Sequence, residues 1–386
     1  MVNSTDEKII NLFKNKKDYY EDRIKDLFPS CDFVFNQKQG VIIYPAGRKT
    51  EVLVQNLIKN GLSVVAVGDS NNNLWGKKIG PCQIFSPEDL AKKYLNFPLI
   101  VSSTDYRQEI TETLKKLGFQ KIFHISFLNF INAVIFPVFP EYHKRFHSLF
   151  EPDNQAEIIR LNSLWEDEES RGTFLKVLQF RLSFNELILN ERKFSSNQYF
   201  EKKFMSFSNE EVFIDCGAFK GETIEQFNLI TSAKFKKIYA FEPDRNNFEK
   251  LEIKCKEIGP TKIDCEPSGV YGFTGKVNFM ETGDAIARIV EDDASLCINV
   301  VSLDDFMKDK ERVTFIKMDI EGAETEALLG AKEIIQKYKP KLAISVYHNA
   351  TDLWEIPLLI KSLNSEYKIY LRHYSNEVMD TVCYAV

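Results

Sequence analysis

The segment Val212-Phe-Ile-Asp-Cys-Gly-Ala-Phe-Lys-Gly-Glu-Thr223 decides the fold of the C-terminal half of the chain. It predicts an apolar β-strand that ends at Asp215, a tight turn bracketed by Gly217 and Gly221, and a helix that begins near Thr223. Glycine is needed in such a turn because a side chain would keep a ligand away from the backbone. A strand, a glycine turn and a helix in this order indicate a cofactor site at one edge of a parallel sheet.

The type of cofactor follows from the acids that accompany the turn. The pattern is DxGxxxG, whereas a dinucleotide fingerprint is GxGxxG with a pyrophosphate at the helix N-terminus. The carboxylate of Asp215 would repel a pyrophosphate but attract the ammonium and sulfonium groups of S-adenosylmethionine. The next predicted strand leads into Glu242, where an acid can accept hydrogen bonds from both ribose hydroxyls. The two acids favour S-adenosylmethionine over a nicotinamide cofactor, and turn glycines beside a solvated acid are the structural alternative.

Residues 208–386 alternate between apolar, β-branched runs and helical patterns, which predicts an α/β domain. The expected strands are 212–215, 237–241, 262–266, 276–280, 314–318, 341–346, 367–373 and 381–385. The expected helices are 223–229, 245–258 and 325–337. Since the last two strands lie close together in sequence, they are expected to form an antiparallel hairpin at the sheet edge.

The N-terminal part shows the same rhythm on a smaller scale. Expected strands lie at 41–44, 63–67, 99–102 and 121–125, with helices at 50–60 and 108–117 and a further helix that starts at Ser86. Gly47 follows the first strand and Asp69 the second, as in half of a nucleotide-binding fold, but GxGxxG would need two further glycines. An Asx-rich turn explains Asp69 equally well. Ligand binding and a structural or dimerising role both stay open for this domain.

These patterns divide the chain into four parts. We expect an N-terminal helical segment at 1–37 and a Rossmann-like α/β domain at 38–128. A helical bridging region at 129–207 follows, and the second α/β domain fills 208–386.

Composition limits the functional classes. The 386 residues are 44% hydrophobic and 27% charged, an ordinary globular balance, and the net charge of −6 argues against a nucleic-acid duplex as partner. The 31 phenylalanines predict aromatic-rich cores. Seven cysteines without a CxxC pair predict reduced thiols in a cytoplasmic protein. No apolar run approaches ~20 residues, so no membrane-spanning helix is expected.

Several motifs of the C-terminal domain resemble the FkbM family of methyltransferases. They are the run from Ile214 to Thr223, the Phe-Glu-Pro-Asp segment at 241–244, Val-Ser-Leu-Asp-Asp at 301–305, and Phe-Ile-Lys-Met-Asp-Ile-Glu-Gly-Ala-Glu at 315–324. Weaker matches are Ser-Val-Tyr-His at 345–348, Asp-Leu-Trp at 352–354 and Leu-Arg-His-Tyr at 371–374. The resemblance covers under half of the chain. It implies a class I methyltransferase fold, with a Rossmann-like seven-strand sheet whose last strand is antiparallel.

The resemblance also implies cofactor-binding residues. The residues that match the first cofactor motif are Asp215, Gly217, Ala218, Gly221 and Thr223. Glu242 matches the ribose-binding acid of the family, and Ser268 falls where the adenine edge is contacted.

Methyl transfer is an in-line displacement in which the enzyme mostly positions the acceptor. An alcohol acceptor must lose a proton, so a base is useful. Asp319 and Glu321 follow a strand beside the cofactor strand and are candidate catalytic residues. They could instead hold a divalent cation such as Mg²⁺, although the sequence shows no third ligand. Glu324 is as well explained by the helix dipole.

Histidines supply further candidates. His348 follows an apolar strand and is a candidate base near neutral pH, with a structural role as the equal alternative. His373 is a weaker candidate, and the i,i+4 pair His143 and His147 lacks the acid that a helical metal motif would need.

The sequence therefore predicts an S-adenosylmethionine-dependent O-methyltransferase. The expected acceptor is a hydroxyl of a sugar, a glycan or a secondary metabolite. A non-catalytic Rossmann scaffold in surface-polysaccharide biosynthesis and a nicotinamide oxidoreductase are the alternatives. N- or C-methylation and a homo-oligomeric state stay open.

Overall fold

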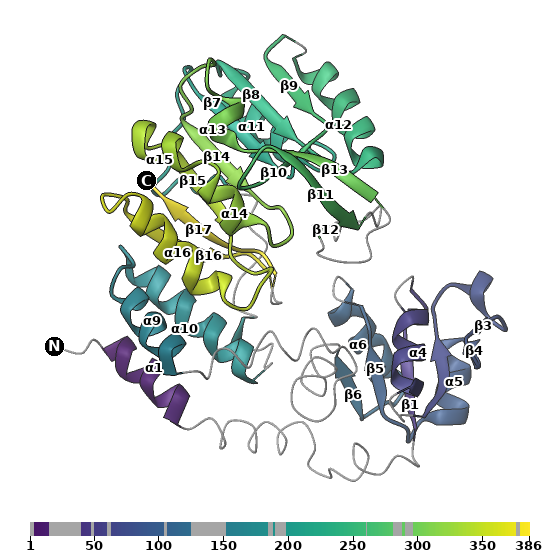
Figure 1. Ribbon diagram of the computed structural model, residues 1–386. Coiled ribbons are helices and arrows are strands. Elements are labelled where there is room, and N and C mark those ends of the chain that lie inside the picture. The colour runs from purple at the N-terminus through teal and green to yellow at the C-terminus, as the bar shows by residue number, and fades with distance from the viewer. Residues whose placement is uncertain are drawn as a thin grey trace. The chain divides into compact units, whose positions relative to one another are not determined.

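The computed structural model describes residues 4–14, 40–47, 50–59, 63–103, 106–124, 152–183, 188–189, 198–259, 261–280, 288–289, 296–375 and 379–386 (Figure 1). The chain divides into two compact units. One consists of residues 11–150 and 178–188, and the other of residues 1–10, 151–177 and 189–386. The predicted histidine pair at 143 and 147 lies outside the described residues.

The first unit contains a six-stranded sheet in the order β3-β4-β2-β1-β5-β6. Its strands are β1 (Val41–Tyr44), β2 (Val64–Gly68), β3 (Lys78–Ile79), β4 (Cys82–Phe85), β5 (Leu99–Val101) and β6 (Ile122–His124). All neighbouring pairs are parallel except β3 with β4. The predicted parallel sheet is confirmed, and β3 and β4 are additional strands. β3 is only two residues long, and β4 contains a single β-branched residue, Ile84, so neither has a clear strand pattern.

The helices of this unit connect the strands. They are α4 (Thr50–Lys59), the 3₁₀ helix η1 (Asn72–Leu74), α5 (Pro87–Tyr94) and α6 (Arg107–Lys116). The predicted start at Ser86 is confirmed, because the Ser86 hydroxyl accepts a hydrogen bond from the backbone N–H of Asp89. Apolar side chains of both helices and strands, among them Ile42, Leu90 and Leu114, form its core.

The second unit is built on a seven-stranded sheet in the order β16-β17-β15-β14-β7-β8-β9. Its strands are β7 (Val212–Cys216), β8 (Lys237–Phe241), β9 (Ile263–Glu266), β14 (Phe315–Met318), β15 (Lys341–Ser345), β16 (Ile369–His373) and β17 (Thr381–Ala385). Only β17 runs antiparallel to its neighbours, so the predicted edge hairpin of β16 and β17 is confirmed. This is the mixed α/β sheet of a class I methyltransferase fold. The central strand β7 has β14 on one side and β8 on the other, which is where such sheets bind ligands.

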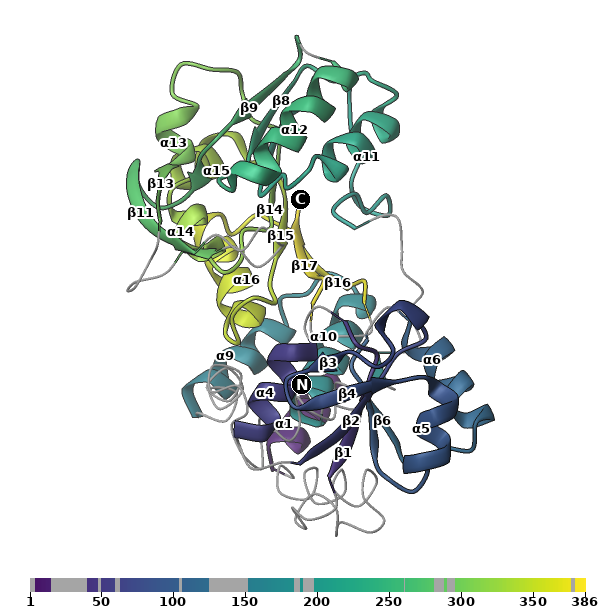
Figure 2. The same cartoon turned by 90° about the vertical axis from the view of Figure 1, so that its right-hand side faces the viewer.

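Helices cover both faces of this sheet. They are α11 (Glu222–Thr231), α12 (Arg245–Ile258), α13 (Leu303–Phe306), α14 (Glu324–Leu329), α15 (Lys332–Tyr338) and α16 (Asp352–Leu363). Figures 1 and 2 show α11 and α12 on one face and α14, α15 and α16 on the other. The predicted aromatic-rich core is present here, since the rings of Phe213 and Phe315 stack 4.7 Å apart and Phe200 and Phe227 pack around them.

A separate four-stranded sheet lies beside the large one, in the order β10-β13-β11-β12. Its strands are β10 (Gly269–Val270), β11 (Gly275–Met280), β12 (Arg288–Ile289) and β13 (Leu296–Val301). The strand predicted at 276–280 therefore belongs to this small sheet, where it pairs with the unpredicted β13.

Three further helices are α1 (Ser4–Lys14), α9 (Pro152–Asn162) and α10 (Glu168–Ser183). The Asn162 side-chain amide donates to the carboxylate of Asp6 at 2.7 Å, which ties α9 to α1. The guanidinium of Arg372 in β16 pairs with Asp167 at 2.6 Å just before α10. Among the described helices, none combines the length and hydropathy that a bilayer crossing requires.

Candidate active site

The turn after β7 has the backbone conformation that its glycines predict. Gly217 has a φ of +77° and Gly221 a φ of +89°, both in the left-handed region. A Cβ atom on Gly217 would lie 2.0 Å from the backbone oxygen of Asp319. Gly217 is therefore required by the close approach of the loop after β14, a reason that the sequence alone did not suggest.

Glu242 follows β8 and faces this turn. Its carboxylate accepts hydrogen bonds from the backbone N–H of Phe219 and of Asp244, each at 2.9 Å. Burial raises the pKa of Glu242 to about 7, while the two backbone hydrogen bonds act to lower it. Each carboxylate oxygen keeps a second lone pair for a further donor, such as a ribose hydroxyl.

Asp215 forms a buried ion pair that the sequence analysis missed. Its Oδ1 lies 3.0 Å from Nζ of Lys317, and the two side chains are 0% and 2% exposed. Lys317 also donates to the backbone oxygen of Gly217 at 2.7 Å. Burial by itself lowers the pKa of Lys317, but the nearby carboxylates raise it overall, so the amine is an ammonium ion. The sequence does show one sign of this ion pair, which is a lysine inside the otherwise apolar strand β14.

This pairing changes the expected role of Asp215. From the sequence, its carboxylate was expected beside the positive groups of the cofactor, but in this structure the carboxylate faces Lys317 and is closed to solvent. Asp215 therefore acts on the turn through Lys317, which holds the carbonyl oxygens of Cys216 and Gly217.

The other proposed cofactor residues lie around the same turn. Ala218 is buried, and its N–H donates to the backbone oxygen of Phe241 at 2.9 Å. Thr223 lies in the first turn of α11 and is half-buried. Ser268 is buried between β9 and β10. The structure thus brings these residues to the carboxyl ends of β7, β8 and β9.

Asp319 lies directly after β14, beside the glycine turn. Its Oδ2 accepts a hydrogen bond from the Tyr199 hydroxyl at 2.7 Å, and its Oδ1 accepts one from the Tyr347 hydroxyl at 2.9 Å. Burial acts to raise the pKa of Asp319, but His348, Lys317 and these hydroxyls lower it overall. Tyr199, which is 120 residues away, was not expected from the sequence.

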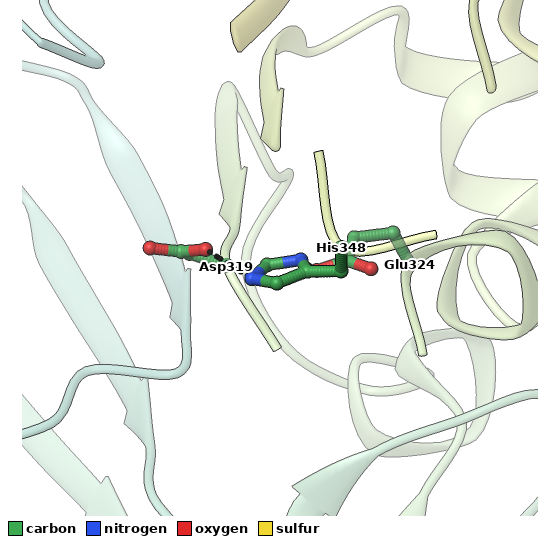
Figure 3. A group of neighbouring side chains, drawn as sticks. All are labelled: Asp319, Glu324 and His348. Carbon is green, nitrogen blue, oxygen red and sulfur yellow. Dashed lines mark ion pairs between the residues drawn. The ribbon is translucent and has the colours of Figure 1, made fainter. Parts of the chain in front are cut away.

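His348 lies among the predicted acids (Figure 3). Its Nε2 is 3.4 Å from Oδ1 of Asp319 and 3.5 Å from Oε2 of Glu321, and its Nδ1 is 2.9 Å from Oε1 of Glu324. Burial acts to lower the pKa of His348, but these three carboxylates raise it to about 10. In this arrangement His348 is an imidazolium ion at neutral pH and becomes a base only when another positive charge replaces that proton.

Glu324 holds a position that a helix-dipole role would not require. The side chain is fully buried, and its Oε1 also accepts from the backbone N–H of Ile320 at 2.9 Å. His373 lies elsewhere, in β16, where its Nδ1 is 2.8 Å from the hydroxyl of Thr381. The cluster of Asp319, Glu321, Glu324 and His348 thus brings the acids that follow β14 together with the histidine that follows β15. His373 is not part of this cluster.

Two family models match the sequence. Residues 215–377 match the model described as methyltransferase FkbM domain. Residues 37–123 match the model described as C2185-like, N-terminal. No protein with a curated description matches the chain.

Several solved structures are similar to this chain. The methyltransferase FkbM from Methylobacillus flagellatus has a TM-score of 0.73 at 24% identity, and the match covers 96% of this chain and 99% of that one. This likeness shows the fold. An rRNA methylase from Streptococcus thermophilus covers 46% of this chain and 86% of its own at 14% identity, with a TM-score of 0.29. Fibrillarin from Aeropyrum pernix, in complex with S-adenosyl-L-methionine, covers 49% and 73% at 12% identity, with a TM-score of 0.30.

Proposed function

Because residues 215–377 match the model of the methyltransferase FkbM domain, we propose that this chain transfers a methyl group from S-adenosylmethionine to a hydroxyl of a sugar, a glycan or a secondary metabolite. The observation that carries the proposal is the pair of features at the ends of β7 and β8. The left-handed glycine turn and the Glu242 carboxylate face one another there, joined by the N–H of Phe219.

The cofactor is proposed to lie across the ends of these strands. Glu242 would accept the ribose hydroxyls, and the turn from Gly217 to Gly221 would leave room for the methionine part beside the backbone. Thr223 and Ala218 would line this turn, and Ser268 would lie at the adenine edge. Asp215 and Lys317 keep the turn in place from below.

The acceptor is proposed to lie on the β14 side of the cofactor. In the reaction, the acceptor oxygen forms a bond to the methyl carbon, the carbon–sulfur bond breaks, and its electron pair stays on sulfur. The acceptor hydroxyl must also give up its proton. The Asp319 carboxylate is 24% exposed and that of Glu321 29%, so both can accept a hydrogen bond from an acceptor hydroxyl.

His348 is proposed to position these two acids, and it would act as a base only after losing its own proton. A divalent cation held by Asp319 and Glu321 is also part of this proposal. The division into parts at 1–37, 38–128, 129–207 and 208–386 stays a proposal as well.

The first test is calorimetric titration of the full chain with S-adenosylhomocysteine, with Glu242→Ala as the binding variant. Glu252→Ala is the matched control, because Glu252 is an exposed acid on α12 that pairs with Lys256. We expect binding by the wild type and by the control, and at least a tenfold loss for Glu242→Ala. Absence of binding by the wild type would refute the proposed cofactor.

The second test identifies the acceptor. Methyl groups labelled on S-adenosylmethionine are followed into a panel of sugars, glycans and hydroxylated metabolites. Transfer that is sensitive to Asp319→Asn supports the proposed acceptor side. Transfer only to amines or carbon acceptors would refute O-methylation.

A further inference from the structure

The cluster at the ends of β14 and β15 has the composition of a metal site. We propose that Asp319, Glu324 and His348 bind one divalent first-row metal ion, with Mn²⁺ as the ion that fits best. The proposal rests on the proposed function, because the ion would lie on the acceptor side of the methyl-transfer site.

The ligands come from three different elements that the fold brings together. Asp319 follows β14, Glu324 opens α14, and His348 lies beyond the end of β15. Each offers one ligand atom, and these three atoms all lie within 4.8 Å of one another. In a six-coordinate ion, opposite ligand atoms are about 4 to 5 Å apart and adjacent ones about 3 Å. The spacing suits one ion once the imidazole turns so that a single ring nitrogen faces both carboxylates, since Nε2 now faces Asp319 and Nδ1 faces Glu324. Figure 3 shows the three side chains together.

A buried atom without a hydrogen bond points to the same ligand. Glu324 is 0% exposed, and its Oε2 has no hydrogen-bond partner among the described residues. Both ring nitrogens of His348, which is 7% exposed, have carboxylates as neighbours, at 2.9 to 3.5 Å. Buried polar atoms almost always have partners, so the orphaned carboxylate oxygen calls for an unseen one. A cation that accepts lone pairs from oxygen and nitrogen satisfies both residues.

The balance of charge also favours a cation. Three carboxylates, those of Asp319, Glu321 and Glu324, lie within 3.5 Å of one imidazole. Lys317, whose charge acts on Asp319, is already paired with Asp215 at 3.0 Å. Buried carboxylates are stable when they are paired or coordinate a metal.

The ligand types select the ion. Mg²⁺ prefers oxygen ligands, whereas this cluster supplies one imidazole nitrogen with two carboxylates. Carboxylates suit Mn²⁺, whereas imidazole is more typical of Zn²⁺, Fe²⁺ and Ni²⁺, so the two carboxylates beside one imidazole favour Mn²⁺. Asp319 and Glu321 lie on the partly exposed side of the cluster, so the remaining coordination positions are open to water or to an acceptor hydroxyl. A bound ion would lower the pKa of such a hydroxyl by acting as a Lewis acid.

The test is direct measurement of metal binding. The full chain is treated with a chelator, and Mn²⁺ is titrated in while the signal of free Mn²⁺ is followed by electron paramagnetic resonance. We expect one bound ion per chain for the wild type, with at least tenfold weaker binding by Glu324→Gln and by His348→Gln. Glu326→Gln is the matched control, because Glu326 is an exposed acid two positions further on α14. Circular dichroism establishes that each variant is folded.

The outcomes separate this proposal from the proposed function. If the wild type does not bind Mn²⁺, or if both folded variants bind it as the wild type does, the metal site is refuted. S-adenosylhomocysteine binding without metal binding would overturn the metal site and leave the methyltransferase proposal standing. Metal binding that depends on Glu324 and His348 supports the site, whatever the cofactor titration shows.

Discussion

The two α/β units share one hydrogen-bonding arrangement at the end of their second strand. In the C-terminal unit, Glu242 accepts from the N–H of Phe219, in the loop after β7, and from the N–H two residues after itself. In the N-terminal unit, Asp69 accepts from the N–H of Ala46 in the loop after β1 at 2.8 Å, and from that of Asn71 at 2.7 Å. Both acids are buried, at 7% and 9% exposed. An acid that ties these loops together is therefore a feature of the fold and does not by itself mark a ligand site.

The two units differ in the residues that pair between their first strand and its other neighbour, which is β14 in the C-terminal unit and β5 in the N-terminal unit. Asp215 in β7 lies opposite Lys317 in β14, and the equivalent pair in the N-terminal sheet is Ile43 opposite Ile100. After β5 in the N-terminal unit, the backbone N–H of Ser102 donates to the backbone oxygen of Tyr44. The corresponding position after β14 in the C-terminal unit is Asp319, which belongs to the cluster around His348. The capacity for chemistry thus lies in the buried ion pair, the glycine turn and the acids after β14, which the N-terminal unit lacks at these positions.

The largest effect is expected from breaking the buried ion pair. Lys317→Met leaves the Asp215 carboxylate buried and unpaired, which should lower the free energy of unfolding by about 3–5 kcal/mol. The double variant Asp215→Leu with Lys317→Met imitates the apolar pair of the N-terminal unit and should regain most of that loss. Urea unfolding followed by circular dichroism measures both. A single variant as stable as the wild type would contradict the importance of this pair.

The sequence predicted those parts of the site that are contiguous. The turn from Asp215 to Gly221 and the acid at Glu242 were found because strand, turn and acid are local patterns with a known spacing. Lys317 gave a visible signal, a charge inside an apolar strand, but only the register of β7 with β14 shows its partner.

Contacts between distant segments were beyond prediction. The bond from Tyr199 to Asp319 joins residues 120 apart, and only the folded sheet brings them together. The sequence likewise placed His348 at a strand end but gave no sign that three carboxylates surround its ring. The strand pair β11 and β13 was half predicted, because β11 was expected and β13 was not.

The glycine turns offer the next contrast. Gly217→Ala places a methyl group 2.0 Å from the oxygen of Asp319 at a φ of +77°, so the turn must move. We expect a loss of about 1–3 kcal/mol in the free energy of unfolding and at least tenfold weaker binding of S-adenosylhomocysteine. Gly47→Ala in the N-terminal unit is the control, since its nearest contact would be Thr50 at 3.8 Å. If the two variants had equal effects in thermal melts and calorimetry, Gly217 would not have the special role in the turn that we assign to it.

Removing the two acids should separate fold from function. Glu242→Ala and Asp69→Ala each leave two backbone N–H groups without their acceptor, so each should lower stability by about 1–3 kcal/mol. Only Glu242→Ala is expected to abolish binding of S-adenosylhomocysteine, by calorimetry on the folded variants. If Asp69→Ala weakened that binding equally, the cofactor would not be confined to the C-terminal unit.

The smallest effect concerns pH. The pKa of Glu242 is raised to about 7, so part of this carboxylate is protonated at neutral pH in the absence of cofactor. Ribose hydroxyls donate hydrogen bonds to the ionised form, and their binding therefore lowers that pKa. By linkage, affinity for S-adenosylhomocysteine should fall as the pH drops below about 7, by up to about tenfold per unit, and level off above it. Glu242→Gln cannot titrate, so its weaker binding should not show this slope. A wild-type affinity that stays constant from pH 8 to pH 6 would show that Glu242 does not meet the cofactor as an anion.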